Sequence, residues 1–144
     1  MDILIKASYE NAINLIPQTP ANLIYIYGFI NNKRLKILID TGATSSIIFN
    51  NTIEKLNINY LIDNNEQNIL RGIGNELSVG RLWCIKLNIN TYYYPISFIV
   101  SNNSILDYDL ILGIHFLKTN NAYIDFKNNK IVLNDIHVIS LYTD

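Results

Sequence analysis

Asp40 has the clearest potential for chemistry, and it begins the segment Asp40-Thr41-Gly42-Ala43. An apolar run at residues 35–39 precedes it, and a second run ending at Phe49 follows it. A carboxylate that ends a buried strand and is fixed by a tight turn can act as an acid or a base in a rigid site. The segment occurs once, so a catalytic aspartate that needs a second aspartate must obtain it from a second copy of the chain.

Two further segments carry weaker signals. Gly72-Ile73-Gly74 has the glycines that permit positive φ and mobility at a hairpin tip. Residues 110–113, Leu-Ile-Leu-Gly, predict a short apolar strand that ends where a helix begins. Each of the three segments alone has an ordinary explanation. The Asp40 segment could be a common turn, the glycine segment a tight hairpin, and residues 110–113 a core strand.

The other polar candidates favour structural roles. Asp107 and Asp109 could suggest a metal site, but a solvated loop before the strand is the better interpretation. We expect His115 to lie at the surface of a helix, and His137 has no cluster of partners in the sequence. We expect Trp83 and the tyrosines to pack in the core and at an interface. The sequence therefore predicts neither a metal nor a cofactor.

Composition limits the class of protein. A length of 144 residues fits one domain, and 49% hydrophobic residues indicate a folded globule. The formal net charge of −1 gives no electrostatic reason to expect nucleic acid or an anionic membrane as a partner. No run reaches the ~18 apolar residues of a membrane span, and the start lacks a signal-peptide pattern. Cys84 is the single cysteine, so we expect a reducing compartment, cytoplasmic or also nuclear.

The elements that must position these residues are short and mostly β. Asn31-Asn32 predicts a hairpin turn, Asn51 predicts a helix cap, and Pro95 predicts an edge or a bulge. The expected strands are residues 23–27, 35–39, 47–49, 92–100, 110–112, 122–126 and 130–133, with a long hairpin over 67–87. The expected helices are residues 8–16, 51–56 and 114–118. Many short strands with little helix indicate a small barrel-like β fold.

In their order and spacing, the three segments resemble the retropepsins, the single-domain aspartic proteases. Asp40-Thr41-Gly42-Ala43 matches the catalytic signature, Gly72-Ile73-Gly74 the flap tip, and residues 111–113 the segment beneath the active-site loop. The likeness extends over residues 23–133. Gly80-Arg81 and residues 124–129 look like the protease domain of the DNA-damage-inducible ubiquitin-shuttle proteins. Thr44 and Ile114 replace an Asp and an Arg that viral members pair, which favours a cellular member or a retroelement.

The resemblance implies a fold and a division of the chain. The implied fold is mainly β, a small closed acid-protease barrel with one short C-terminal helix and a short N-terminal helix, assembled as a homodimer. Residues 1–20 would be a helical extension and connector, residues 21–135 the protease domain, and residues 136–144 a C-terminal tail.

The resemblance also implies roles for individual residues. Asp40 of each copy would form a dyad that activates water against a peptide bond, with Thr41 and Gly42 completing the catalytic loop. The substrate-binding residues would be those of the subsites and the flap: Leu38, Ala43, Ile47, Gly72, Ile73, Gly74 and Ile111. The implied partners are a second copy and a peptide or protein substrate, with ubiquitinated proteins suggested by the shuttle family.

Two alternatives to this aspartic endopeptidase stay open. One is a catalytically silent dimerisation or peptide-binding module with the same fold. The intact Asp40-Thr41-Gly42 argues against it, because a silent copy has no chemical need for the acid. The other is a protease that processes the polyprotein of a retroelement.

Overall fold

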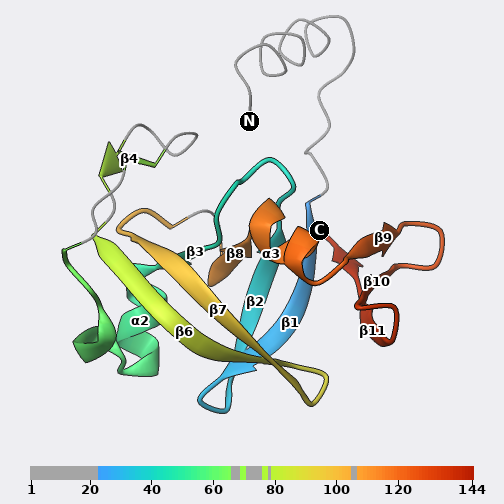
Figure 1. Ribbon diagram of the computed structural model, residues 1–144, viewed down its shortest axis with the longest axis horizontal. Helices are drawn as coiled ribbons and strands as arrows, with labels where there is room; N and C mark the ends of the chain where they lie inside the picture. The colour runs from blue at the N-terminus through green and yellow to red at the C-terminus, as the bar shows by residue number, and fades with distance from the viewer. Residues whose placement is uncertain (1–22, 66–68, 71–75, 78, 105–106) are drawn as a thin grey trace, which may run out of the picture.

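The computed structural model describes residues 23–65, 69–70, 76–77, 79–104 and 107–144 (Figure 1). The expected helix at residues 8–16 and the Gly72-Ile73-Gly74 segment lie outside the described residues. The described elements, in chain order, are β1 Ile24–Ile30, β2 Lys33–Ile39, β3 Ile47–Phe49, α2 Asn50–Leu56, the 3-10 turn η1 Asn59–Leu61, β4 Ile69–Leu70, β5 Glu76–Leu77, β6 Gly80–Ile89, β7 Tyr92–Ser101, β8 Leu110–Leu112, α3 Ile114–Thr119, β9 Tyr123–Asp125, β10 Lys130–Leu133, β11 His137–Ser140 and β12 Tyr142–Thr143.

Two hairpins turn on pairs of residues with left-handed backbone, a conformation that Asn tolerates well and the β-branched Thr91 rarely adopts. Asn31 and Asn32 have φ of 50° and 62° and join β1 to β2, as their sequence predicts. Asn90 and Thr91, with φ of 49° and 71°, join β6 to β7 in the same way. Positive φ at both central residues gives a turn whose twist matches the strands it connects.

The long hairpin expected over residues 67–87 is different in the structure. β4 and β5 pair with each other, whereas β6 pairs along its length with β7. The expected hairpin therefore corresponds only to the β4–β5 pair, and β6 forms a separate hairpin with β7 through Asn90-Thr91, a turn that the sequence analysis did not predict.

The principal sheet closes on itself. Its strand order is β12-β1-β2-β8-β3-β7-β6, and a contact between Phe29 of β1 and Asn88 of β6 closes the barrel. β8 inserts between β2, to which it is parallel, and β3, to which it is antiparallel. The insertion brings the ends of β2 and β8 together, with Ile39 opposite Leu112, and Figure 1 shows both strands leading to the same side of the barrel. The mainly β barrel expected from the sequence is confirmed.

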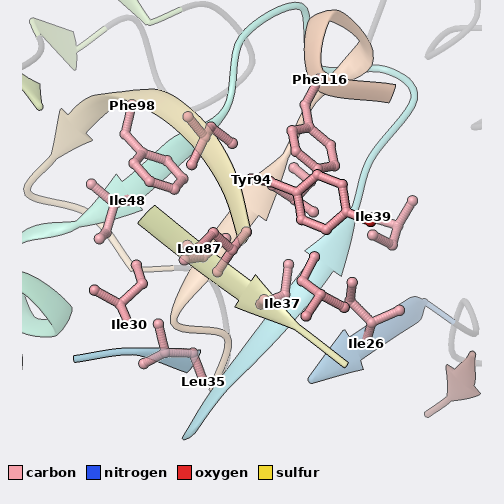
Figure 2. Close-up of a cluster of buried hydrophobic side chains, with 14 of the residues drawn as sticks. Ile26, Ile30, Leu35, Ile37, Ile39, Ile48, Leu87, Tyr94, Phe98 and Phe116 are labelled. Atoms are coloured by element: carbon pink, nitrogen blue, oxygen red, sulfur yellow. The ribbon is translucent and has the colours of Figure 1, made fainter. Parts of the chain in front are cut away.

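Apolar side chains fill both faces of the strands near this end. In β8, Leu110 and Leu112 pack in the barrel interior, whereas Ile111 packs in a second cluster on the other face. Figure 2 shows the interior cluster, where Ile37, Leu87, Tyr94 and Phe116 converge. Because successive strand residues point to opposite faces, an unbroken apolar strand must be covered on both sides.

The C-terminal region adds strands to two sheets. β11 pairs with β10, which also pairs with β9, and β12 pairs with the start of β1. Residues 136–144, expected as a tail, therefore contain β11 and β12. None of the helices that the structure describes combines the length and the apolar character needed to cross a membrane.

Two local predictions have different outcomes. The expected cap at Asn51 is wrong, because α2 begins directly after β3 with Phe49 at the cap position and no side-chain cap bond. Of the two alternatives at Pro95, the edge is confirmed and the bulge is not, because the bulge of this strand pair lies on β6 between Leu82 and Ile85. Pro95 is tolerated because β3 pairs with β7 only at residues 99–101, which leaves Pro95 with β6 on one side.

Candidate active site

Asp40 is fixed by the strand that runs beside β2. Its backbone N–H donates to the Leu112 carbonyl of β8 at 3.0 Å, which continues the ladder between the two strands by one step. Asp40 is half-buried, and it is the first residue of segment 40–46, which we call the Asp40 loop. The paired, buried strands β2 and β8 therefore fix the position of Asp40 at the end of the barrel.

The turn holds one oxygen of this carboxylate. The Gly42 N–H donates to Asp40 Oδ1 at 2.9 Å, and the Ala43 N–H donates to the Asp40 carbonyl at 3.2 Å. A short acidic side chain that accepts from the backbone two residues later closes an Asx turn. Thr41 and Gly42, at the apex, are exposed.

The far side of the Asp40 loop is tied to α3. The Ile114 and His115 N–H groups, at the start of that helix, donate to the Ala43 and Thr44 carbonyls at 2.7 Å and 3.1 Å. The first N–H groups of a helix have no partner within it, so the loop satisfies them. The loop and the helix thus fix each other.

Gly113 and Ser46 join the loop to the end of β8. The buried Gly113 N–H donates to Ser46 Oγ at 3.1 Å. A Cβ at position 113 would lie 2.6 Å from the Ser45 carbonyl oxygen and 2.8 Å from that of Ala43. Both neighbours are backbone atoms, so only glycine fits. The sequence did not single out Ser46, because a serine between a turn and a strand has no distinctive local pattern.

The structure brings together the predicted subsite residues that it describes. Leu38, Ile47 and Ile111 belong to the second apolar cluster, and Ala43 packs against it. They come from β2, β3, β8 and the Asp40 loop, which are the elements that precede, contain and follow Asp40 or pair with β2. The exposed fractions of Leu38, Ile47 and Ile111 are 5%, 7% and 1%. The predictions at Gly72, Ile73 and Gly74 fall outside the described residues.

The cluster also contains residues that the sequence reasoning missed. Phe49, Ile99 and Tyr108 complete it, contributed by β3, β7 and the segment before β8. Ile99 lies opposite Ile47 in the parallel pairing of β7 with β3. That pairing joins distant segments, so no local pattern could have revealed it.

A hollow of about 360 Å³ lies beside the apex of the loop. Thr41, Ile114, Leu117 and Ile124 are among the residues that line it. Its lining also includes Lys118 but no carboxylate. The exposed apex thus borders a partly apolar concavity formed largely by α3 and the start of β9.

The remaining polar candidates have structural partners. The loop prediction holds for Asp107, which is exposed, but Asp109 is half-buried and accepts from the Lys36 N–H at 2.7 Å. His115 is exposed, as expected, whereas His137 stacks on Tyr92 with ring centres 3.5 Å apart. In the part of the chain that the structure describes, no three His, Cys, Asp or Glu side chains gather into a possible metal site.

Trp83 does not lie in the core. Its side chain is 49% exposed, and its indole N–H donates to Asp63 Oδ2 at 3.0 Å. Trp83 directly follows the buried Leu82 on β6, so strand alternation places this aromatic residue, which we expected in the core, on the outer surface of the barrel.

Comparison with known proteins agrees with this geometry. The family model described as aspartyl protease matches residues 18–125. DNA damage-inducible protein 1 of Candida glabrata is 33% identical over 128 residues, which are 88% of this chain and 29% of that protein. The Saccharomyces cerevisiae protein of the same name is 32% identical over 127 residues, 87% of this chain and 29% of its own length. The chain thus spans less than a third of the length of these relatives.

Solved structures show the same likeness. The retroviral protease-like domain of Ddi1 from Leishmania major matches with a TM-score of 0.74 and 27% identity, covering 85% of this chain and 95% of that one. A retropepsin-like aspartic protease from Rickettsia conorii shares the fold, with a TM-score of 0.53 and 19% identity over 85% of this chain and 92% of its own. With Asp40 held in its turn at the end of β2, the chain belongs to the aspartyl protease family and has a retropepsin-like fold.

Proposed function

We propose that the chain is an aspartic endopeptidase that works as a homodimer, with Asp40 of each copy in one dyad. The observation that supports this most is the clamped carboxylate: Asp40 is held by Leu112 and Gly42 while the loop apex stays exposed. A two-fold axis through the apex would make the same surface of each copy meet its equivalent. The hollow beside Thr41 offers room for a group from the partner.

The dyad would divide one proton between two acids. Two carboxylates about 3 Å apart cannot both ionise easily, so one stays protonated. The ionised member takes a proton from water as the water oxygen attacks the amide carbonyl carbon. The protonated member donates to the carbonyl oxygen, which gives a tetrahedral diol. The member that took the proton from water then gives it to the amine nitrogen as the C–N bond breaks, and the other member recovers its proton from a diol hydroxyl. The chemistry needs no covalent enzyme intermediate, metal or cofactor.

The substrate in this proposal is an extended peptide with apolar side chains beside the cleaved bond. Leu38, Ala43, Ile47 and Ile111 would contact those side chains, because they form one apolar cluster on the loop and strands that hold Asp40. Gly42 would offer its backbone, and Gly72, Ile73 and Gly74 would cover the peptide. Ubiquitinated proteins as partners, and a cytoplasmic or nuclear location, stay predictions from the sequence.

Cleavage of a pooled peptide library by the wild-type chain and by Asp40→Asn tests the proposal. The library is incubated from acid to neutral pH and read by mass spectrometry, with Asp107→Asn as a control that removes one exposed carboxylate elsewhere. We expect cleavage by the wild type and by Asp107→Asn, and a loss of at least about 10²-fold in Asp40→Asn. If none of the chains cleaves at concentrations where the wild type is dimeric, the silent binding module replaces the protease.

A further inference from the structure

A second hollow, of about 350 Å³, lies at the end of the Asp40 loop, where Ser45 and Ser46 line it. It is formed by β6, β7, α3 and the end of the Asp40 loop, and we call it the Arg81 pocket. Arg81, Trp83, Ser97 and His115 contribute its distinctive polar and aromatic groups. Its volume is at the lower end of the range for sites that hold small ligands, and it suits one side chain or chain end.

The β6 bulge shapes this pocket. Arg81 and Trp83 are two positions apart and share the outer face of the strand, whereas Leu82 between them is fully buried. Beyond them, Cys84 takes a positive φ of 51°, and its N–H donates to Ser97 Oγ at 3.1 Å. The bulge thus ties β6 to Ser97 of β7 in the pocket wall, next to the half-exposed indole.

The Arg81 backbone is fixed by hydrogen bonds, but its side-chain Nε lacks an acceptor among the described residues. Its backbone exchanges two hydrogen bonds with that of Asp63, at 2.8 Å and 2.9 Å. Its Nε is buried and has no acceptor among the residues that the structure describes. A buried donor without an acceptor is costly, because it has lost its water without replacing it.

The nearby carboxylate is already engaged elsewhere. Asp63 accepts the Trp83 indole N–H at Oδ2 and the Asn65 N–H at Oδ1, both at 3.0 Å. These bonds, the indole bond first, lower the pKa of Asp63 and keep it ionised. Because its oxygens hold Trp83 and a turn, Asp63 fixes the aromatic wall and leaves Arg81 Nε without an acceptor.

The lining of the pocket favours an anion. It contains the Arg81 cation, the His115 imidazole and several hydroxyl groups, but no Asp or Glu. The Arg81 guanidinium carbon lies 5.4 Å from the centre of the Trp83 ring, an arrangement that pre-orients a guanidinium for a planar acceptor. The indole adds an apolar surface for the methylene groups of a ligand.

The pocket is continuous with the proposed cleft. Ile99 lines the pocket and also belongs to the apolar cluster of Leu38, Ile47 and Ile111. The Ile99 N–H donates to the Ser46 carbonyl at 3.0 Å, which joins the pocket wall to the Asp40 loop. A peptide that lies along the apolar cluster can therefore extend a residue into the pocket.

We propose that the Arg81 pocket binds a carboxylate of the peptide substrate, away from the cleaved bond. Arg81 would grip it through Nε and a terminal nitrogen after a small rotation of the side chain, because paired N–H groups match carboxylate geometry. Trp83 would cover the stem of the ligand. The carboxylate comes either from an acidic side chain or from the C-terminus of the peptide. The identity of the ligand as substrate rests on the proposed protease function.

Binding can be measured without cleavage, because Trp83 is the single tryptophan of the chain. Titrations of Asp40→Asn by Trp83 fluorescence use three N-acetylated peptides with apolar flanks. One has Glu and a C-terminal amide, one has Gln and an amide, and one has Gln and a free C-terminal carboxylate. We expect a carboxylate peptide to bind about tenfold more tightly than the neutral one, which corresponds to about 1.4 kcal/mol.

Variants separate the pocket from general electrostatics. Arg81→Met, combined with Asp40→Asn, should bind all three peptides equally, whereas Arg81→Lys should restore only part of the preference because it lacks the planar fork. Arg34→Met is the matched control, since it removes an exposed guanidinium that lies 3.6 Å from the centre of the Tyr27 ring. It should keep the full preference. Circular dichroism and thermal melting check that each variant is folded.

The outcomes are distinct. Tighter binding of the Glu peptide supports an acidic side chain as the source, and tighter binding of the free-carboxylate peptide alone supports a chain end. Equal binding of all three by a folded Asp40→Asn overturns the proposal, as does a preference that survives in Arg81→Met. In the wild type, the ratio of kcat/KM for Glu and Gln peptides should follow the same pattern. If the wild type cleaves nothing, the protease proposal fails, and the fluorescence result still decides whether the pocket binds carboxylates.

Discussion

At the scale of single residues, Ser46 and Gly113 determine how closely the Asp40 loop lies on the barrel. Ser46 Oγ is the acceptor for the buried Gly113 N–H, and Gly113 lets the loop carbonyls approach where a side chain would collide with them. Neither residue reacts with anything. Both hold the backbone on which the position of the Asp40 carboxylate depends.

Ser46→Ala should destabilise the fold by about 1–3 kcal/mol, because it leaves a buried N–H without an acceptor. Urea unfolding measures the change. Ser46→Thr keeps the hydroxyl and should recover most of the loss, and Ser45→Ala, at the neighbouring half-buried position, should change stability little. A Ser46→Ala variant as stable as the wild type would show that the Gly113 N–H has another acceptor.

At the scale of elements, one cluster fastens β12 to the barrel. Asp144 accepts from the Tyr108 hydroxyl and from Lys36 Nζ, the latter at 3.3 Å, and its N–H donates to the Leu23 carbonyl at 3.1 Å. The Tyr108 hydrogen bond, followed by Lys36, holds the pKa of Asp144 below its usual value. Burial first, and then Asp144, raises the pKa of Tyr108.

Asp144 should therefore make the free energy of unfolding depend on pH in the acid range. A carboxylate whose pKa is lower in the folded state contributes fully above its unfolded pKa of about 3.9, and the contribution is lost as pH falls through the folded value. The wild type should be more stable than Asp144→Asn at pH 7, and the difference should shrink below about pH 4. Chemical unfolding at a series of pH values measures it.

Tyr108→Phe is the control for this cluster, because it removes only the hydroxyl that donates to Asp144. It should reduce the same pH-dependent difference, and the double variant should add little to either single change. A difference between the wild type and Asp144→Asn that stays constant down to pH 2 would contradict the assigned bond.

At the scale of the whole molecule, the exposed apex of the Asp40 loop governs assembly in our proposal. If two copies meet there, the melting temperature and the specific activity should both rise with protein concentration, because only the folded state forms the dimer. Thr41→Arg would place two like charges face to face, which costs several kcal/mol at an interface. We expect a loss of dimer and a fall in specific activity of more than about tenfold.

Sedimentation at several concentrations measures the assembly directly. The control is Asn102→Arg, an equal change at an exposed position after β7, which should leave both assembly and activity unchanged. Full activity from a chain that stays monomeric at all concentrations would exclude a dyad made from two copies.

The sequence by itself determined the local features. The apolar run at residues 35–39 predicted β2, Asn31-Asn32 predicted its hairpin, and Asp40-Thr41-Gly42 predicted a carboxylate in a turn at the end of the strand. Each of these depends on neighbours within a few residues, through side-chain period or backbone preference. Such signals are visible in the order of amino acids alone.

Only the tertiary structure decided how distant segments meet. β8 lies between β2 and β3, Ser46 accepts from Gly113, and Arg81 and Trp83 of β6 line one pocket with residues of β7 and α3. Strands with similar apolar patterns can pair in many ways, and the barrel that buries the most apolar surface selects one of them. The partner of β6, the strands within residues 136–144 and the Arg81 pocket all follow from that selection, which no local pattern encodes.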